Sequence, residues 1–416
     1  MIKKFIISAC LLLSLVSFAQ EGTSSPYSFY GIGDIRFKGT LENRSMAGVA
    51  VEQDSIHINL ENPASYANLK LTTFSLGGTY ATKNLKSNSG SASTRSTTLD
   101  YLAVGLPLGK FGAGFGLIPY SSVGYKIESL SAIDGALNRR LSGKGGLNKV
   151  FLGVGYKIAP NFSIGADVHY NFGKIETNSL EFVTNVPVGT RELNTADLSG
   201  VNFNIGTMYQ AKISKKLNLY TSLNYTLESS LTSKNTRNIS SVKFSSAFDV
   251  AVVDVLANQN EQMNVKMPSK ISFGAGIGES KKWLIGGMVA YKKTSGQENS
   301  YNQASNVGYG RYGSVSLGGY YIPSYNSFSS YAKRIVYRGG IKYEKTGLMV
   351  NAESINDMGF TLGLGLPITG SFSNINLGFE LGKRGTTNAN LVQENYANFS
   401  VGFSLNDKWF DKRKFN

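Results

Sequence analysis

The sequence contains very little cysteine, proline or histidine. Cys10 is the single cysteine, and the 416 residues include 9 prolines and 2 histidines. Residues 1–19 have the pattern of a secretory signal peptide, with two lysines, an apolar run and the small-x-small site Ser17-Phe18-Ala19. If cleavage follows this site, the mature chain has no disulfide, thiolate chemistry or cysteine metal site. The alternative, a lipoprotein box at Cys10, is disfavoured because this cysteine lies too early in the apolar run.

Long apolar runs are also absent after the signal peptide. No run of about 18 apolar residues occurs, so no transmembrane helix is expected. Charged residues make up 17% of the chain, the net charge is +15, and hydrophobic residues make up 41%, which does not fit a disordered chain. Nor does any basic and aromatic patch match a nucleic-acid-binding module, so no nucleic acid partner is expected. The 47 glycines, with 23 tyrosines and 23 phenylalanines, indicate a large β-structure.

Alternation of apolar and polar residues begins at Leu71. Segments of about ten residues alternate in this way, as barrel strands do. The clearest hairpin, 150–172, turns at Ala159-Pro160-Asn161. Aromatic residues recur near strand ends, and the polar face consists mainly of glycine, serine, asparagine and threonine, as a lumen requires. The pattern predicts an all-β fold, a transmembrane antiparallel β-barrel of about 14 strands over residues 71–405.

The connections between these strands differ in length. Short turns such as 107–110 and 367–373 alternate with longer polar stretches such as 122–148, 174–199 and 228–268. Outer-membrane barrels have short periplasmic turns and long outer loops. We therefore expect an integral protein of the outer membrane of a Gram-negative bacterium.

Residues 20–70 have no clean period of two or of 3.6, unlike the chain that follows. We expect this segment to form a periplasmic hatch, or plug, inside the barrel. Asn62, Pro63 and Ala64 are predicted to form the hinge of the hatch, since proline fixes its own φ and biases Asn62 toward an extended conformation. Residues 406–416 form a predicted basic periplasmic tail that includes Lys412-Arg413-Lys414.

Several short motifs, in a fixed order along the chain, resemble those of the FadL family of outer-membrane barrels. They are Ser24-Ser25-Pro26-Tyr27, Gly31-Ile32-Gly33, Met46-Ala47-Gly48, Asn62-Pro63-Ala64, Met267-Pro268-Ser269, Leu317-Gly318-Gly319-Tyr320-Tyr321-Ile322-Pro323 and Tyr337-Arg338-Gly339-Gly340. The closing Gly382-Lys383-Arg384-Gly385 and Trp409-Phe410 resemble the branch found in Bacteroidota. The resemblance implies a 14-stranded barrel with an N-terminal hatch that moves hydrophobic molecules. In such a transporter the hatch shifts, and the ligand leaves through a gap in the wall at the third strand.

The predicted third strand contains a candidate lateral gate. Its inward row includes Gly112, Gly114 and Gly116, and Pro119 follows beside it. Proline cannot donate a ladder hydrogen bond, and glycine weakens a strand. The alternative interpretation is that Pro119 only ends the strand near the outer rim.

Charged residues on lumen-facing rows are candidates for ligand binding. They are Arg334, Arg338, Lys342, Asp167 and His169. The three cations could hold the carboxylate or phosphate headgroup of an amphipathic ligand. The alternative is structural pairing, either with strand residues such as Glu380 or with carboxylates of the hatch such as Asp34, Glu52 or Asp54.

No enzyme active site is predicted. His57 and His169 are isolated from matching carboxylate sets, so neither a metal site nor a cofactor is expected. His169 with Asp167 could suggest a barrel hydrolase, but no oriented nucleophile or oxyanion donor stands out. The runs Gly274-Ala275-Gly276 and Gly363-Leu364-Gly365 lie in predicted strands, which excludes a phosphate loop. Inward glycines instead provide space for a hatch to approach the wall.

Two functions follow from these expectations. The first is a channel for uptake of hydrophobic or amphipathic, fatty-acid-like molecules, by hatch displacement and possible lateral release. Its partners would be a hydrophobic small molecule or lipid and the outer membrane. The second is a plugged barrel that serves as a structural or accessory subunit of a larger secretion or assembly complex, with other outer-membrane proteins as partners.

Overall fold

The computed structural model describes residues 22–35, 39–131, 133–244, 250–293 and 306–409; the predicted signal peptide and Lys412-Arg413-Lys414 lie outside this range. Its wall is one antiparallel sheet that closes where the last strand pairs with the first strand of the wall. The strands of the wall are β2 (Thr72–Ser87), β3 (Gly90–Leu108), β4 (Phe111–Ser129), β5 (Leu137–Ala159), β6 (Phe162–Val183), β7 (Val188–Lys212), β8 (Asn218–Thr226), β9 (Ser229–Phe244), β10 (Val250–Met267), β11 (Lys270–Glu279), β12 (Trp283–Lys293), β13 (Val307–Tyr309), β14 (Arg311–Tyr321), β15 (Val336–Val350), β16 (Glu353–Pro367), β17 (Asn374–Arg384) and β18 (Gln393–Asp407).

Three pairs of these segments belong to single strands of the wall. The segments β8 and β9, β10 and β11, and β13 and β14 follow one another directly and share neighbouring strands, so the closed barrel has 14 strands. The predicted 14-stranded antiparallel barrel is therefore confirmed. Short 3-10 turns, η4 (Ala332–Arg334) and η5 (Asn388–Asn390), lie between strands.

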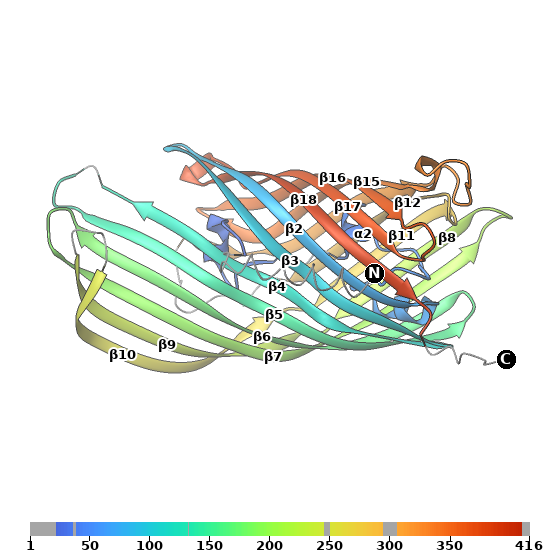
Figure 1. Cartoon of the computed structure of the whole chain (residues 1–416). Coiled ribbons are helices and arrows are strands. Elements are labelled where there is room, and N and C mark those ends of the chain that lie inside the picture. The colour runs from blue at the N-terminus through green and yellow to red at the C-terminus, as the bar shows by residue number, and fades with distance from the viewer. Residues whose placement is uncertain (1–21, 36–38, 132, 245–249, 294–305, 410–416) are drawn as a thin grey trace.

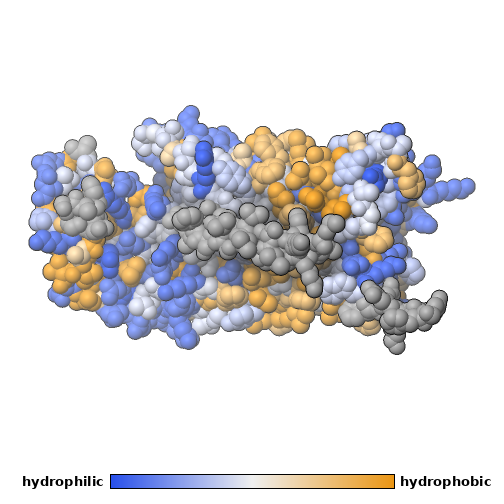
Figure 2. Space-filling model, viewed as in Figure 1, coloured by the Kyte–Doolittle hydropathy of each residue, from blue (hydrophilic) through white to orange (hydrophobic). Residues whose placement is uncertain are grey.

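Side chains along the wall are arranged in the reverse of a water-soluble sheet. On β7, Phe203 is 53% exposed, whereas Asn204 beside it is 2% exposed. Leu152 and Ile205 likewise face outward, while Asn171 is buried inside. Apolar side chains pointing out and polar ones pointing in are favourable only where lipid surrounds the barrel. On the face seen in the space-filling view, hydrophobic residues form a band across the barrel (Figure 2).

The barrel has a turn end and a loop end. At the turn end, on the right of Figure 1, neighbouring strands are joined by short connections such as 109–110, 160–161 and 280–282, which matches the predicted turns. At the loop end the prediction of long polar loops is wrong, because 174–183 and 188–199 are paired strand residues of β6 and β7. Both faces of these strand ends are polar, so the sequence there shows no alternation of apolar and polar residues, although the hydrogen-bonded ladder continues. The side of the barrel formed by β4 to β7, β9 and β10 therefore projects further at the loop end than the side formed by β15 to β18 (Figure 1).

The N-terminal segment, described at residues 22–35 and 39–71, lies in the interior of this barrel (Figure 1). Its elements are η1 (Pro26–Phe29), β1 (Asp34–Ile35), α2 (Leu41–Arg44) and η2 (Pro63–Asn68). None of the described helices is long and apolar enough to cross a membrane. Side chains of the segment such as Val49, Val51 and Tyr66 are almost fully buried against the wall. These side chains thus occupy part of the lumen.

Candidate functional site

The ladder between β3 and β4 is incomplete. These strands pair only from Leu108 and Phe111 at the turn end to Leu102 and Leu117. Beyond that point β3 continues its ladder with β2, and β4 continues with β5. Among the described residues, the wall therefore has a gap between the loop-end halves of β3 and β4. This gap between β3 and β4, which we call the wall gap, is visible in Figure 1 as a fork that opens toward the loop end.

The N-terminal segment spans the wall gap from inside. On one side, Ser24 Oγ lies 2.6 Å from Thr94 Oγ1 of β3, and the hydroxyl of Tyr27 donates to the carbonyl of Val392 at 2.5 Å. On the other side, Asp34 and Ile35 of β1 pair with Ser122 and Ser121 of β4. Gly33, at φ +90°, precedes this contact; a Cβ there would lie 2.6 Å from the carbonyl oxygen of Ser122. Glycine is required because the backbones approach so closely.

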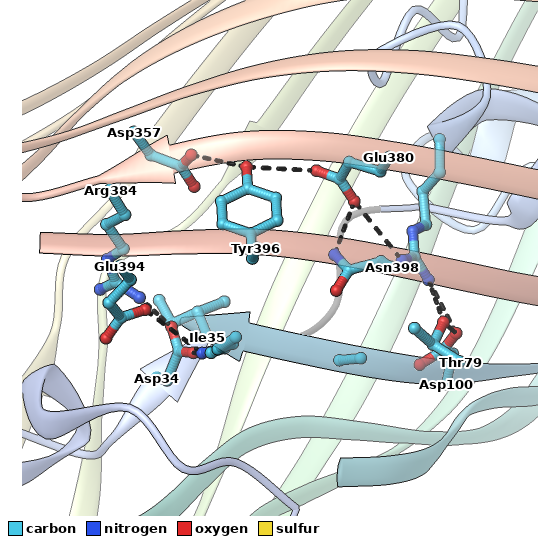
Figure 3. A pocket seen from close by; sticks show the side chains of 13 residues that line it. Asp34, Ile35, Thr79, Asp100, Asp357, Glu380, Arg384, Glu394, Tyr396 and Asn398 are labelled. Carbon is cyan, nitrogen blue, oxygen red and sulfur yellow. Dashed lines mark hydrogen bonds and ion pairs between the residues drawn. The ribbon is translucent and has the colours of Figure 1, made fainter. Parts of the chain in front are cut away.

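Two groups of ion pairs hold the N-terminal segment to the wall. Arg44 of α2 contacts Asp100 of β3 at 2.7 Å and lies 3.9 Å from Glu380 of β17. Asp34 of β1 contacts Arg384 of β17 at 2.7 Å and Lys83 of β2 at 3.8 Å. We call these six residues the charged lock (Figure 3). All six side chains are 9–14% exposed, so the pairs are much less screened than surface ion pairs.

Polar side chains extend the charged lock along β16 and β18. Glu394 accepts a hydrogen bond from Ser25 and lies 3.3 Å from Lys83 Nζ. The hydroxyl of Tyr396 donates to Asp357 at 2.7 Å, and Asn398 donates to Glu380 at 3.1 Å (Figure 3). The seam where β18 meets β2 therefore presents a continuous row of acceptors and donors to the N-terminal segment.

Asn62, Pro63 and Ala64 lie deep against the wall, and β2 starts only at Thr72. The amide of Asn62 donates to the carbonyls of residues 207 and 223 and to the hydroxyl of Ser222 at 2.9–3.2 Å. Its oxygen also accepts from the N–H of Ala64 at 3.0 Å and so caps η2. In this structure these three residues anchor the segment to β7 and β8; their predicted role as a hinge stays a prediction.

The glycines predicted for the gate contact η2 or lie in the paired part of the wall. A Cβ on Gly112 would lie 1.8 Å from the carbonyl oxygen of Tyr66, and one on Gly114 would lie 2.9 Å from the Tyr66 ring. Gly116 pairs with Ala103 inside the ladder of β3 and β4. Pro119 is the one residue of the four that lies beyond the end of this ladder.

Other inward glycines also provide space for the N-terminal segment, as predicted. A Cβ on Gly274 would lie 2.6 Å from Val51, and one on Gly363 would lie 2.3 Å from the hydroxyl of Ser45. The same holds for Gly318, whose Cβ would approach the carbonyl oxygen of Met46 to 2.3 Å. The motifs Met46-Ala47-Gly48 and Leu317-Gly318-Gly319 therefore meet face to face inside the barrel.

Two of the predicted lumen cations are paired in the structure. Arg338 is 8% exposed and donates to Asn376 at 3.0 Å, and Asn376 donates to Glu42 of α2 at 2.9 Å. Lys342 forms an ion pair with Glu380. Arg334 was predicted on the same lumen-facing row, but it does not lie on β15, which starts only at Val336. Arg334 lies in η4 at the turn end, 5.3 Å from the ring of Tyr331.

Asp167 and His169 form a separate pair on β6. Their side chains are 2.7 Å apart, and His169 Nδ1 lies 3.2 Å from the amide of Asn202. Among the described residues, the partners of this imidazole are Asp167 and Asn202, and none is a serine. In the part of the chain that the structure describes, no group of three or more histidine, cysteine, aspartate or glutamate side chains could hold a metal ion. The pair lines the lumen beside Tyr66 rather than joining the cations of β15.

A third polar group lies in the N-terminal segment near the turn end. His57 Nδ1 is 2.6 Å from Asp54, and His57 Nε2 is 4.0 Å from Glu42. Burial alone would lower the pKa of His57, but the charges of Asp54 and Glu42 outweigh it and raise this pKa. Burial would likewise raise the pKa of Asp54, but His57 and two backbone N–H groups hold it at about 2. The carboxylate of Asp54 and the protonated form of His57 therefore stabilise each other.

The space left around the N-terminal segment is small. Cavities of about 70, 90 and 100 Å³ lie between it and the wall. The first is lined by residues of the charged lock, and the third by Arg44, Lys342 and Lys270. Pockets for small-molecule ligands usually measure about 300–1,000 Å³. None of these three cavities could hold a fatty-acid-sized ligand while the N-terminal segment is seated as it is here.

Comparison with known families gives a match over the whole sequence. The family model described as BamG matches residues 1–416. The chain belongs to the BamG family. No curated protein matches this BamG-family chain.

Solved structures similar to this BamG-family chain include two toluene transporters and a FadL homologue, all with low sequence identity. The toluene transporter TodX of Pseudomonas putida has a TM-score of 0.61 and 14% identity, with 91% of this chain and 100% of that one covered. A FadL homologue of Pseudomonas aeruginosa has a TM-score of 0.58 and 11% identity, with 90% and 99% covered. The toluene transporter TbuX of Ralstonia pickettii has a TM-score of 0.56 and 14% identity, with 88% and 98% covered. These similarities establish a FadL-like fold.

Arg44, Asp100, Lys83 and Glu394 were not predicted as site residues. The sequence could have indicated Asp100, Lys83 and Glu394, since each is a charged residue on a polar row that alternates with outward residues. Arg44 had none, because the aperiodic N-terminal segment does not reveal which of its side chains meet the wall.

Proposed function

We propose that the chain is an outer-membrane channel for hydrophobic or amphipathic small molecules. In this proposal the N-terminal segment is a displaceable hatch, and the wall gap is a lateral exit. The observation that carries the proposal is the end of the β3–β4 ladder at Leu102 and Leu117, with the opening bridged by residues 24–35. Unpaired strand edges are costly at membrane depth, so an opening of this kind requires cover. The FadL-like fold, shared with toluene transporters, supports it further.

Opening of the channel requires the charged lock to separate. Each of the three cavities described above is too small for a ligand, so in this proposal the N-terminal segment moves before a ligand passes. An anionic headgroup entering from the loop end would compete with Glu380 for Arg44 and Lys342. Its apolar tail would then leave through the wall gap, and transfer of apolar surface into lipid would drive this step without a cofactor. Membership of the Bacteroidota branch remains part of this proposal.

A disulfide that fixes the N-terminal segment to β4 at the edge of the wall gap tests the lateral exit. Ile35 and Ser121 are directly paired residues of β1 and β4, at a Cα separation that a disulfide can bridge. In the variant I35C/S121C, oxidation should abolish uptake of a toluene-like probe into proteoliposomes, and reduction should restore it. The matched control is L106C/A113C, which joins β3 and β4 where they are already paired. Equal uptake by oxidised and reduced I35C/S121C would contradict a moving hatch at this gap.

One observation favours the accessory role as a second candidate. Apolar side chains at the loop end are exposed away from the membrane band; they include Ile133 at 75%, Val253 at 62% and Leu256 at 59%. Figure 2 shows this apolar zone at the loop end, separated from the band by hydrophilic surface. Native mass spectrometry of the membrane-extracted protein distinguishes the two functions. A stoichiometric protein that is lost in V253S/L256S supports the accessory role, and a bound lipid without protein supports transport.

A further inference from the structure

Charges on the short side of the barrel are segregated by face. On β14 to β18, β2 and β3, five cations point outward and are exposed: Lys86, Arg95, Arg311, Lys345 and Lys383. Every carboxylate on these strands except Asp407, at the turn end, lies on the lumen-facing rows: Asp100, Glu344, Glu353, Asp357, Glu380 and Glu394. Within the described residues, none of the five outward cations has an ion pair. The outer surface of this wall therefore carries charge of one sign at its loop end.

These cations lie at the loop-end edge of the apolar band. Lys345 follows the exposed Ile341 and Tyr343 on one outward row, and Lys383 follows Phe379 and Leu381 on another. In an outer-membrane barrel, an apolar band followed by basic side chains places those side chains at the depth of lipid headgroups. A lysine costs little there, whereas at the bilayer midplane it would be strongly unfavourable.

The strand registers bring three of the cations within reach of one headgroup. Lys345 pairs with Gly313, two residues from Arg311, and Lys383 pairs with Met358, two residues from the partner of Lys345. With strands ~4.8 Å apart and ~3.4 Å per residue, Arg311 lies roughly 8 Å from Lys345, and Lys345 about 12 Å from Lys383. These separations fit a headgroup that carries two phosphates.

On the taller side of the barrel, four cations of β5 and β6 are paired with carboxylates. The pairs are Arg139 with Glu181 at 2.7 Å, Arg140 with Glu128 at 2.8 Å, and both Lys144 and Lys174 with Glu176 at 2.9 and 3.2 Å. This side projects beyond the short side (Figure 1), so these residues face water rather than headgroups. On the short wall, by contrast, the described carboxylates near the loop end lie on lumen-facing rows and leave the five outward cations without such a neighbour.

We propose that the outward cations Arg311, Lys345 and Lys383, flanked by Lys86 and Arg95, bind the phosphates of an acylated phosphoglycolipid in the outer leaflet. The inference rests on the proposed location in the outer membrane. Arginine and lysine form charge-assisted hydrogen bonds with phosphate oxygens, and the apolar rows below them pack against the acyl chains. The bound lipid would hold the short wall, and thus the seam that carries the charged lock, at a fixed depth.

The experiment uses the full chain in nanodiscs and native mass spectrometry after addition of bisphosphorylated lipid A. Wild type should retain one lipid A, and R311Q/K345Q/K383Q should bind it roughly 100-fold more weakly. The control R139Q/K144Q/K174Q, which neutralises three cations of the taller side, should bind like wild type. Equal binding by both triple variants, or equal binding of dephosphorylated lipid A, would overturn the proposal. So would displacement by millimolar inorganic phosphate, which would indicate a site for a soluble anion.

Failure of the proposed location has a different signature. A protein that does not span a bilayer would not enter nanodiscs at all, whichever lipid was supplied. Incorporation of all three proteins without selective retention of lipid A would reject the lipid site and leave the channel proposal standing. Probe uptake by R311Q/K345Q/K383Q, measured in liposomes without lipid A, should equal wild type because these residues lie outside the lumen.

Discussion

Arg44 lies in a helix of only four residues, and its guanidinium reaches two different strands of the wall. It contacts Asp100 on β3 and approaches Glu380 on β17, which brackets the seam between β18 and β2. A buried ion pair adds little net stability by itself, but removing one partner leaves the other charge buried without compensation. We therefore expect Arg44 to stabilise the position of the N-terminal segment against the wall.

Substitution R44M tests this role. It leaves Asp100 buried without its cation and should destabilise the seated segment by about 3 kcal/mol. Hydrogen exchange of the Ser45 and Met46 amides, which donate to carbonyls of α2, should then become roughly 100-fold faster. The control is K383M, one residue from Arg384 on β17 but pointing outward without an ion pair. Unchanged protection in R44M would show that the ion pairs do not hold the segment.

At the level of elements, the wall and η2 approach each other at glycines. Gly112 lies under the carbonyl of Tyr66, and Gly165 lies 2.4 Å, measured from its hypothetical Cβ, from the carbonyl carbon of Pro63. Contacts of this kind allow backbone to pack on backbone, with no side chain between. Alternation in the sequence showed that these glycines face inward, but it could not show which segment they face.

Substitution G112A introduces a Cβ 1.8 Å from the carbonyl oxygen of Tyr66, so η2 or β4 must shift. We expect a loss of about 1–3 kcal/mol in the stability of the folded barrel, as for other overpacked sites. Thermal unfolding in detergent, followed by circular dichroism, measures it. The matched control is G313A on β14, where a Cβ would have nothing within 4 Å. An equal melting temperature for G112A and G313A would mean that η2 is not seated as described.

Sequence reasoning predicted the strands that cross the apolar band and missed their polar continuations. The hairpin of β5 and β6 has its turn where the alternation placed it, at 160–161. Residues 174–183 were predicted as loop because both faces of that stretch are polar, although the ladder with β7 extends to Phe182. Backbone hydrogen bonding outside lipid leaves no hydrophobic period. Alternation could not locate the wall gap either, since the gap depends on which strands fail to pair; the family resemblance alone indicated a gap at the third strand, which is β4.

In the whole molecule, the N-terminal segment forms hydrophobic clusters with the inner face of the wall. Ile58, Leu60 and Tyr66 pack with Tyr101 and Phe151 of the wall. Val49 and Val51 likewise pack with Tyr220 and Leu284. The polar rows of the lumen are satisfied by the segment too, for instance at Asn62 and Arg44. The N-terminal segment therefore adds to the packing of the wall, and its displacement as a hatch must break these contacts.

Deletion of residues 24–66 tests this view of the whole barrel. The ladder of 14 strands does not depend on the segment except at β1, so the barrel should still assemble and resist denaturation on a gel at room temperature. It should unfold at a lower temperature than R44M, because the deletion also exposes the apolar side chains of the two clusters to water. In planar bilayers it should conduct small ions steadily, whereas R44M should show only brief openings. A deleted barrel as impermeable as wild type would place the seal elsewhere in the lumen and contradict the plug.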